Sequence, residues 1–142
     1  MNIFEALRED HDKQRTLVDI LVKTHGDSDG RREIFDKLKK ELRDHADAEE
    51  RHFYIPLIES DLTQDKARHS IAEHHDIDEL LEELEETDMS SPGWLAAAKK
   101  LHHEVNHHLD EEEHEVFQMA GKVLSDQQKE KLAKDFKAER AS

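Results

Sequence analysis

The sequence predicts an all-α protein: an up-down-up-down antiparallel four-helix bundle with a short fifth C-terminal helix. The composition supports this class, because the 142 residues are 40% charged and include only four glycines, two prolines and few aromatic residues. Such a composition favours helices over strands. Apolar residues also recur every three or four positions, which is the helical period. The length suits one domain, 1–142, with the bundle at about 2–120.

Each helix is bounded by residues that start or stop helices. A turn rich in glycine and aspartate, HGDSDG, follows the first helix, and Thr63 is placed to cap the third. Ser91, which a proline follows, caps the fourth, and a capping box starts at Ser125 before the fifth. The expected helices therefore lie at about 2–24, 31–58, 64–86, 92–120 and 126–139.

Charge and composition restrict the class of protein. The formal net charge of −15 argues against binding to nucleic acid or to an anionic membrane surface. No apolar run approaches the roughly 20 residues that span a bilayer, and no signal peptide precedes the first helix, so we expect a cytoplasmic protein. With 12 histidines and no cysteine, any transition metal would have to be bound by imidazole and carboxylate groups.

Histidine interrupts the apolar stripe of all four long helices. In two of them a glutamate follows the histidine by four residues, so that both side chains project from one face. All the interruptions lie roughly 15–24 Å from the adjacent turn, which places them in one middle layer of an antiparallel bundle. The residues of this layer are His11, His45, Glu49, His74, His108 and Glu112.

Six such groups in a core are costly unless they bind an ion. Each unpaired buried carboxylate or imidazole costs several kcal/mol, against a total stability of about 5–15 kcal/mol for a typical domain. Two metal ions suit six ligands if the two glutamates bridge them. Imidazole with carboxylate favours iron, with manganese or zinc as alternatives. A single buried histidine is usually an ordinary core residue, but four interruptions at matching depth indicate a metal site.

Other polar residues have less certain places. His52 is either a hydrogen-bond partner of a ligand or a ligand itself, and Tyr54 either bonds a bridging group or packs at the edge of the core. Glu113 is an alternative to Glu112 as the metal-binding carboxylate of the fourth helix. The remaining histidines fall off the stripes and are expected to face solvent, a neighbouring side chain or a helix end: His25, His69, His75, His102, His103, His107 and His114.

The ordered motifs resemble those of the hemerythrin-like HHE cation-binding domains. They read DHDKQ around His11, HADAEERHFYIPL from His45, EHHDI at 73–77 and HHLDEEEHEVF at 107–117. The resemblance implies a non-haem diiron centre with four terminal histidines and with Glu49 and Glu112 as bridging carboxylates.

Two positions depart from the oxygen-carrying hemerythrins. Asp78 stands where they have a second histidine in the third helix, and Glu113 stands where they have an aspartate. One imidazole fewer leaves a more open site, unless Asp78 completes the coordination sphere.

Three functions remain in view. The first is a diiron protein that binds oxygen or a related small ligand, for oxygen or redox sensing or for iron handling. The second is a diiron oxidoreductase acting on peroxide, nitric oxide or ferrous iron, and the third is a structural bundle without metal. The last helix is too short to be an output domain, and its Leu132 and Phe136 are expected to dock on the bundle or on an unidentified partner.

Overall fold

The computed structural model covers residues 1–142 and consists of helices and connecting turns, without strands. The all-α class is therefore confirmed. In chain order the elements are α1 (Ile3–Leu21), α2 (Asp29–Glu49), η1 (Glu50–Tyr54), α3 (Ile55–Ile58), α4 (Gln64–Glu86), α5 (Pro92–Glu111), η2 (Glu112–Val116), α6 (Phe117–Val123) and α7 (Asp126–Arg140).

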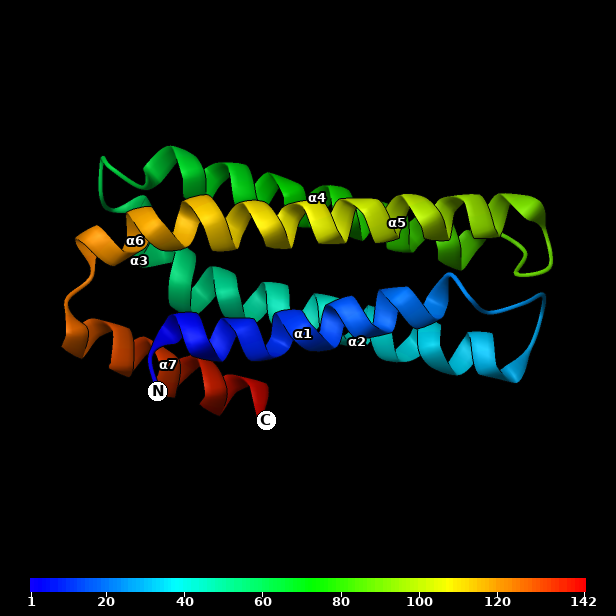
Figure 1. Ribbon diagram of the computed structural model, residues 1–142, viewed down its shortest axis with the longest axis horizontal. Coiled ribbons are helices and arrows are strands. Elements are labelled where there is room, and N and C mark those ends of the chain that lie inside the picture. The colour runs from blue at the N-terminus through cyan, green and yellow to red at the C-terminus, as the bar shows by residue number, and fades with distance from the viewer.

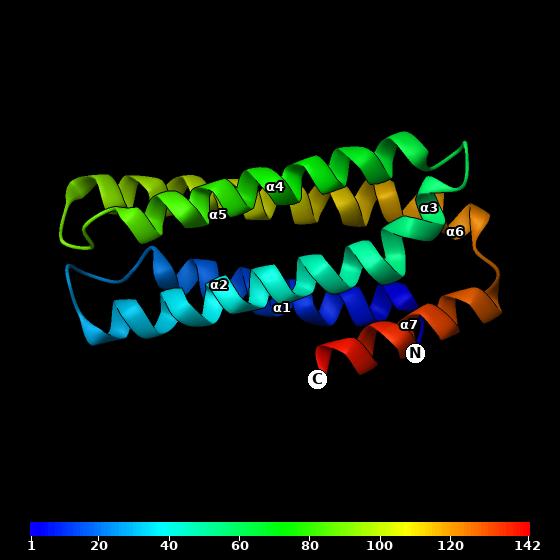
Figure 2. The same ribbon diagram turned by 180° about the vertical axis from the view of Figure 1, so that it is seen from behind.

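The long helices form two antiparallel pairs that lie side by side. One pair is α1 with α2, and the other is α4 with α5 and its continuation α6 (Figure 1). The C-terminal helix α7 folds back along α1 and α2 at the end of the molecule where both termini lie (Figure 2). The shared face of the four long helices is therefore enclosed, and α7 covers one end of the α1–α2 pair.

Local sequence explains most helix ends. Ser91 accepts a hydrogen bond from the backbone of Trp94, and Ser125 forms the predicted capping box with Gln128. The turn after α1 contains Gly26 at φ +57°, a left-handed conformation that glycine adopts without steric cost. Thr63 precedes α4 at the expected N-cap position, but its side chain does not cap the helix, because its buried hydroxyl donates to the carbonyl of Leu57 at 2.6 Å.

Two of the predicted helices are not continuous. The expected helix 31–58 contains the five-residue π-helical segment η1, and the expected helix 92–120 contains η2. Each segment closes with a hydrogen bond five residues back, from Ile55 to Glu50 and from Phe117 to Glu112. Pro56 favours the first of them, because it lacks the N–H that an α-helix would direct to the preceding turn.

The π segments change which residues face the core. One extra residue in a turn rotates the following chain, so two adjacent residues are buried at the end of each segment: Phe53 with Tyr54 in η1, and Val116 of η2 with Phe117 at the start of α6. The apolar face then continues through Leu57 and Ala120. Met119, which an unbroken helical stripe would place inside, is only half-buried.

Two apolar clusters of 14 buried residues each make up the core. One contains Leu7, Phe53 and Phe117 and lies near the termini, and the other contains Val18, Leu42 and Leu101. Along α1, His11 and Gln14 fall between the residues of the first cluster and those of the second. A polar layer therefore separates two dry regions of the bundle.

Candidate metal centre

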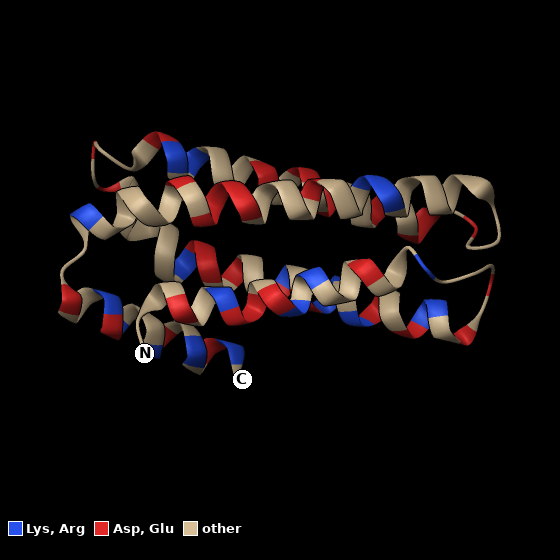
Figure 3. Ribbon diagram, in the orientation of Figure 1, with Lys and Arg blue, Asp and Glu red and all other residues tan.

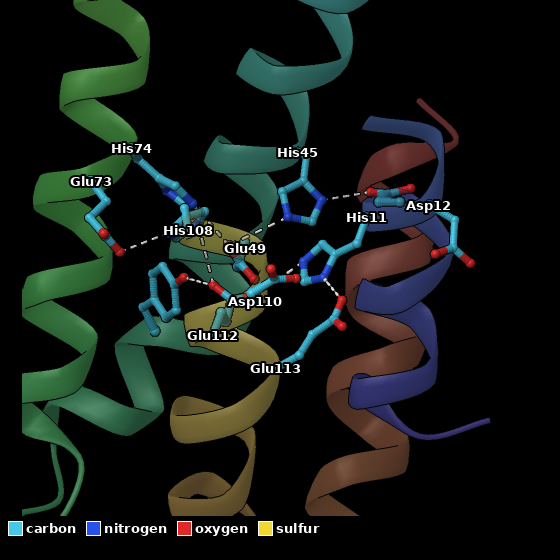
Figure 4. Close-up of polar contacts among 12 residues, drawn as sticks. His11, Asp12, His45, Glu49, Glu73, His74, His108, Asp110, Glu112 and Glu113 are labelled. Atoms are coloured by element: carbon cyan, nitrogen blue, oxygen red, sulfur yellow. Dashed lines mark hydrogen bonds and ion pairs between the residues drawn. The ribbon is translucent and has the colours of Figure 1, made fainter. Parts of the chain in front are cut away.

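The six residues predicted for the polar layer lie together in the structure. Each of the four long helical segments contributes one histidine, and the two glutamates enter from α2 and from the start of η2 (Figure 4). Glu49 and Glu112 are fully buried, and His74, the most accessible of the six, has a side chain that is only 8% exposed. The spacing of four residues between His45 and Glu49, and between His108 and Glu112, places each pair on one helical face.

These side chains form two groups that share one carboxylate. Glu49, His74, His108 and Glu112 each offer a ligand atom within 4.8 Å of the others, and so do His11, His45 and Glu49. Glu49 therefore belongs to both groups. Glu112 also reaches the second group, because its Oε1 lies 3.2 Å from the Nε2 atom of His11. The arrangement provides two adjacent positions for ions.

All four imidazoles direct Nε2 toward these carboxylates. Glu49 Oε1 lies 3.4 Å from His45 Nε2 and 3.1 Å from His74 Nε2, and Glu112 Oε2 lies 3.6 Å from His108 Nε2. The Nε2 atoms of His11, His45 and His108 are buried without a hydrogen-bond partner, as are both oxygens of Glu49 and Oε1 of Glu112. Such groups normally cost about 1–3 kcal/mol each. The residues therefore fit a metal centre, since ions would bind the atoms that the protein leaves unsatisfied.

The opposite ring nitrogens are held by carboxylates. Nδ1 of His11 donates to Glu113 at 2.7 Å, Nδ1 of His45 donates to Asp10 at 2.8 Å, and Nδ1 of His108 donates to Glu73 at 3.0 Å. Nδ1 of His74 lies 3.7 Å from Glu50, beyond hydrogen-bond distance. Carboxylates in this position orient metal-binding imidazoles and leave Nε2 free to coordinate.

Without an ion, protons take up part of the charge in the layer. Burial opposes the charged form of His45, but the charges of Glu49 and Asp10 outweigh it and raise the pKa of His45 to about 10. Burial likewise opposes the charge of His74, and hydrogen bonding to Glu49 raises its pKa to about 9. Burial and the neighbouring charge of Glu49 raise the pKa of Glu112. Metal binding would displace protons from these groups.

Four residues whose roles the sequence left open have other partners. Glu113 does not replace Glu112; it accepts from His11 and from Arg15, at 2.7 and 3.1 Å. Asp78 accepts from Nε of Arg43 at 2.8 Å and does not join either ligand group. His52 lies 3.0 Å from Glu139 on α7, and the buried Tyr54 hydroxyl donates to Glu112.

Periodicity alone did not identify the residues that support His45. Asp10 lies beside His11 in the sequence but bonds His45, and Arg140 on α7 donates to Asp10 at 2.8 Å and also to Glu41. Burial works to raise the pKa of Asp10, but His45 and Arg140 lower it to about 2. The C-terminal helix is therefore linked to the polar layer by charged hydrogen bonds, because Arg140 and His45 both donate to Asp10. A carboxylate next to a ligand histidine in the sequence was the only available signal.

A cavity of about 420 Å³ leads to the centre from the surface between α2 and α4. Its walls include His74 and His108, the apolar residues Leu42 and Leu81, and Gln14 of α1. Gln14 is 2% exposed, and its Nε2 has no hydrogen-bond partner. A small molecule in this cavity would lie beside two of the imidazoles.

Taken together, the helical bundle and its buried cluster of His and Glu define a cation-binding domain. A family model, the hemerythrin HHE cation binding domain, matches residues 2–120. The chain belongs to this family.

One solved structure agrees with this assignment at the level of fold, and a second relative is similar in sequence. The crystal structure of a hemerythrin HHE cation binding domain-containing protein from Mycobacterium kansasii superimposes with a TM-score of 0.87 and 26% identity. The match covers 97% of this chain and 84% of that one. A protein from Nostoc sp. named DNA nickase is 30% identical over 97% of this chain, which spans 39% of the length of that relative.

Proposed function

We propose that this protein is a non-haem diiron protein that binds oxygen or a related small ligand, in oxygen or redox sensing or in iron handling. The observation that carries the proposal is the pair of ligand groups sharing Glu49, whose inward atoms lack other partners. His74, His108 and Glu112 would hold one ion together with Glu49, and His11 and His45 would hold the other. Iron bound there would supply a ferrous–ferric redox couple, and manganese or zinc would use the same ligands.

The protein's own residues support access by a small ligand. On α4 the residue four positions after His74 is Asp78, which accepts from Arg43 and belongs to neither ligand group, so α4 would supply only His74 to an ion held there. Both Asp78 and His74 line the cavity. Apolar walls formed by Leu42, Ile77 and Leu81 would limit the water that accompanies the ligand.

Gln14 is suited to bind the ligand, because the residue lines the same cavity and its buried Nε2 has no hydrogen-bond partner. We expect Gln14→Leu to weaken azide binding to the metal-loaded protein by roughly tenfold, the effect of losing one hydrogen bond. The metal content should not change, since Gln14 belongs to neither ligand group. An absorption titration with azide measures this. Gln118→Leu, at an exposed position on α6, should leave azide affinity unchanged.

The experiment that tests the proposed function is elemental analysis of the purified protein, with an absorption spectrum recorded in air on the same sample. About two irons per chain with ferric charge-transfer bands in the near-ultraviolet would support it. Zinc or manganese instead would keep the site and remove the oxygen chemistry. A folded protein without metal that is indifferent to chelator would reject the proposal. Turnover of added peroxide, nitric oxide or ferrous iron, rather than stoichiometric spectral change, would favour the oxidoreductase alternative.

We do not propose a nucleic-acid function for this chain from the name of the Nostoc relative. We infer that the shared segment is a cation-binding domain inside a longer protein, because the match covers 39% of that relative. Acidic side chains lie along every long helix and outnumber basic ones, 36 to 21 (Figure 3). Such a surface repels a phosphate backbone. As for membranes, none of the helices is long and apolar enough to cross one.

A further inference from the structure

A second cluster of histidine and glutamate lies outside the centre, on the surface where α4 and α5 meet. Each helix contributes a His–Glu pair spaced by four residues: His69 with Glu73 on α4, and His107 with Glu111 on α5. Both histidines fall off the apolar stripes, as expected for residues that face solvent, and their side chains are more than half exposed, at 58% and 55%. Periodicity could not show that the two pairs face each other.

The four side chains converge across the helix pair. Nε2 of His69 lies 2.9 Å from Glu111 and 3.6 Å from Glu73, and Nε2 of His107 lies 3.1 Å from Glu111 and 3.8 Å from Glu73. Ligand atoms of His69, Glu73 and Glu111 all lie within 4.8 Å of one another. Two histidines and two carboxylates at such separations can share one small cation with modest side-chain rotation.

The charge of this cluster is not balanced by the protein. Neither Glu73 nor Glu111 forms an ion pair with lysine or arginine, and imidazoles are their only ionic partners. The nearby Lys66 pairs with Glu115 instead. Neutral imidazoles, the form that binds metal, would leave two negative charges for a divalent ion to neutralise.

Glu73 is fixed in place by the centre. Its Oε1 accepts a hydrogen bond from Nδ1 of the buried His108 (Figure 4). Its Oε2 faces His69 and His107 at the surface. The carboxylate is only 13% exposed, so it is held more firmly than an ordinary surface glutamate. This anchoring lowers the entropy that a cation would have to overcome in ordering its ligands.

We propose that His69, Glu73, His107 and Glu111 form a separate binding site for a divalent first-row transition-metal cation. The site shares Glu73 with the outer face of the centre, so an ion bound there would sit one carboxylate away from His108. The surface site uses no atom that would bind an ion in the centre, so it can form whichever metal the centre holds.

The test is a titration of the protein, as purified and with its metal content measured, with Co²⁺ as the probe. Wild type should bind about one more Co²⁺ per chain than the variant His69→Ala/His107→Ala, and the additional ion should give visible d–d bands. In the variant, the affinity for this additional ion should fall at least about tenfold. Both histidines are exposed, so the variant should keep the helical circular dichroism of wild type. His75→Ala is the matched control, because His75 pairs only with Glu79 on the same helix, at 3.0 Å.

The comparison remains decisive if the centre is partly empty. Cobalt that enters the centre does so in wild type and variant alike, and the difference of one ion still reports the surface site. Equal uptake and equal spectra in wild type and the double variant would overturn the proposal. So would an equal loss in His75→Ala, because the effect would then belong to surface histidines in general.

Discussion

Replacing Glu49 by alanine is expected to remove both of the metal ions that we propose for this centre. Glu49 is the one carboxylate that belongs to both ligand groups, whereas Glu112 belongs to one and approaches the other only through His11. Glu112→Ala should therefore lose at least one ion. Ions present at about 1,000 times their dissociation constant stabilise a protein by about 4 kcal/mol. We expect the midpoint of thermal unfolding to fall by roughly 10–15 °C in Glu49→Ala.

Elemental analysis and calorimetry measure the two effects, and the metal-free state provides the internal control. In excess chelator the stabilities of Glu49→Ala and wild type should differ less than they do with metal present, because the contribution of bound ions is then absent from both proteins. His103→Ala, at an exposed position on α5, should retain metal and thermal stability. Equal metal content in Glu49→Ala and His103→Ala would show that the ligand assignment is wrong.

The position of the polar layer could be predicted because it depends on helical periodicity. His11, His45, His74 and His108 each replace an apolar residue in a stripe, and the depth of a residue in an antiparallel hairpin follows from its distance to the turn. The structure brings these four together with Glu49 and Glu112, whose role as ligands stays a prediction.

Contacts between distant parts of the chain could not be predicted in this way. Glu73 adjoins His74 in the sequence yet bonds His108, and Asp10 adjoins His11 yet bonds His45. In both cases the carboxylate lies about 100° round its helix from the neighbouring histidine and so faces a different helix. Arg140, at the end of α7, carries no periodic signal at all, because its partner Asp10 is 130 residues away.

The π-helical segments mark another limit of periodicity. Each begins directly after or at the glutamate of a His-x-x-x-Glu motif, and the register of the apolar face shifts beyond it. Pro56 was a local indication for η1, but the residues of η2 contain no proline or glycine that would favour the irregularity. Their common position beside Glu49 and Glu112 relates them to the site, as π segments in helices often are.

Replacing Phe136 by alanine is expected to destabilise the whole bundle and to weaken its hold on the metal ions that we propose for the centre. Phe136 of α7 is 1% exposed, belongs to the apolar cluster near the termini, and packs its ring 5.7 Å from that of His45. Truncating a buried phenylalanine costs about 3–5 kcal/mol. The prediction that this residue docks on the bundle is thus confirmed by its contacts, and the variant tests what the docking contributes.

Two measurements on Phe136→Ala separate packing from support of the centre. Urea unfolding of the metal-free protein gives the change in the free energy of unfolding that is due to packing. The rate at which chelator removes metal from the folded protein gives the effect on His45. Both should change, because α7 covers His45 with Phe136 and fixes its partner Asp10 through Arg140. Leu132→Ala, at a half-buried position on the same helix, should change stability less and the removal rate hardly at all. Metal removal at the wild-type rate from Phe136→Ala would mean that α7 only adds stability and takes no part in holding the centre.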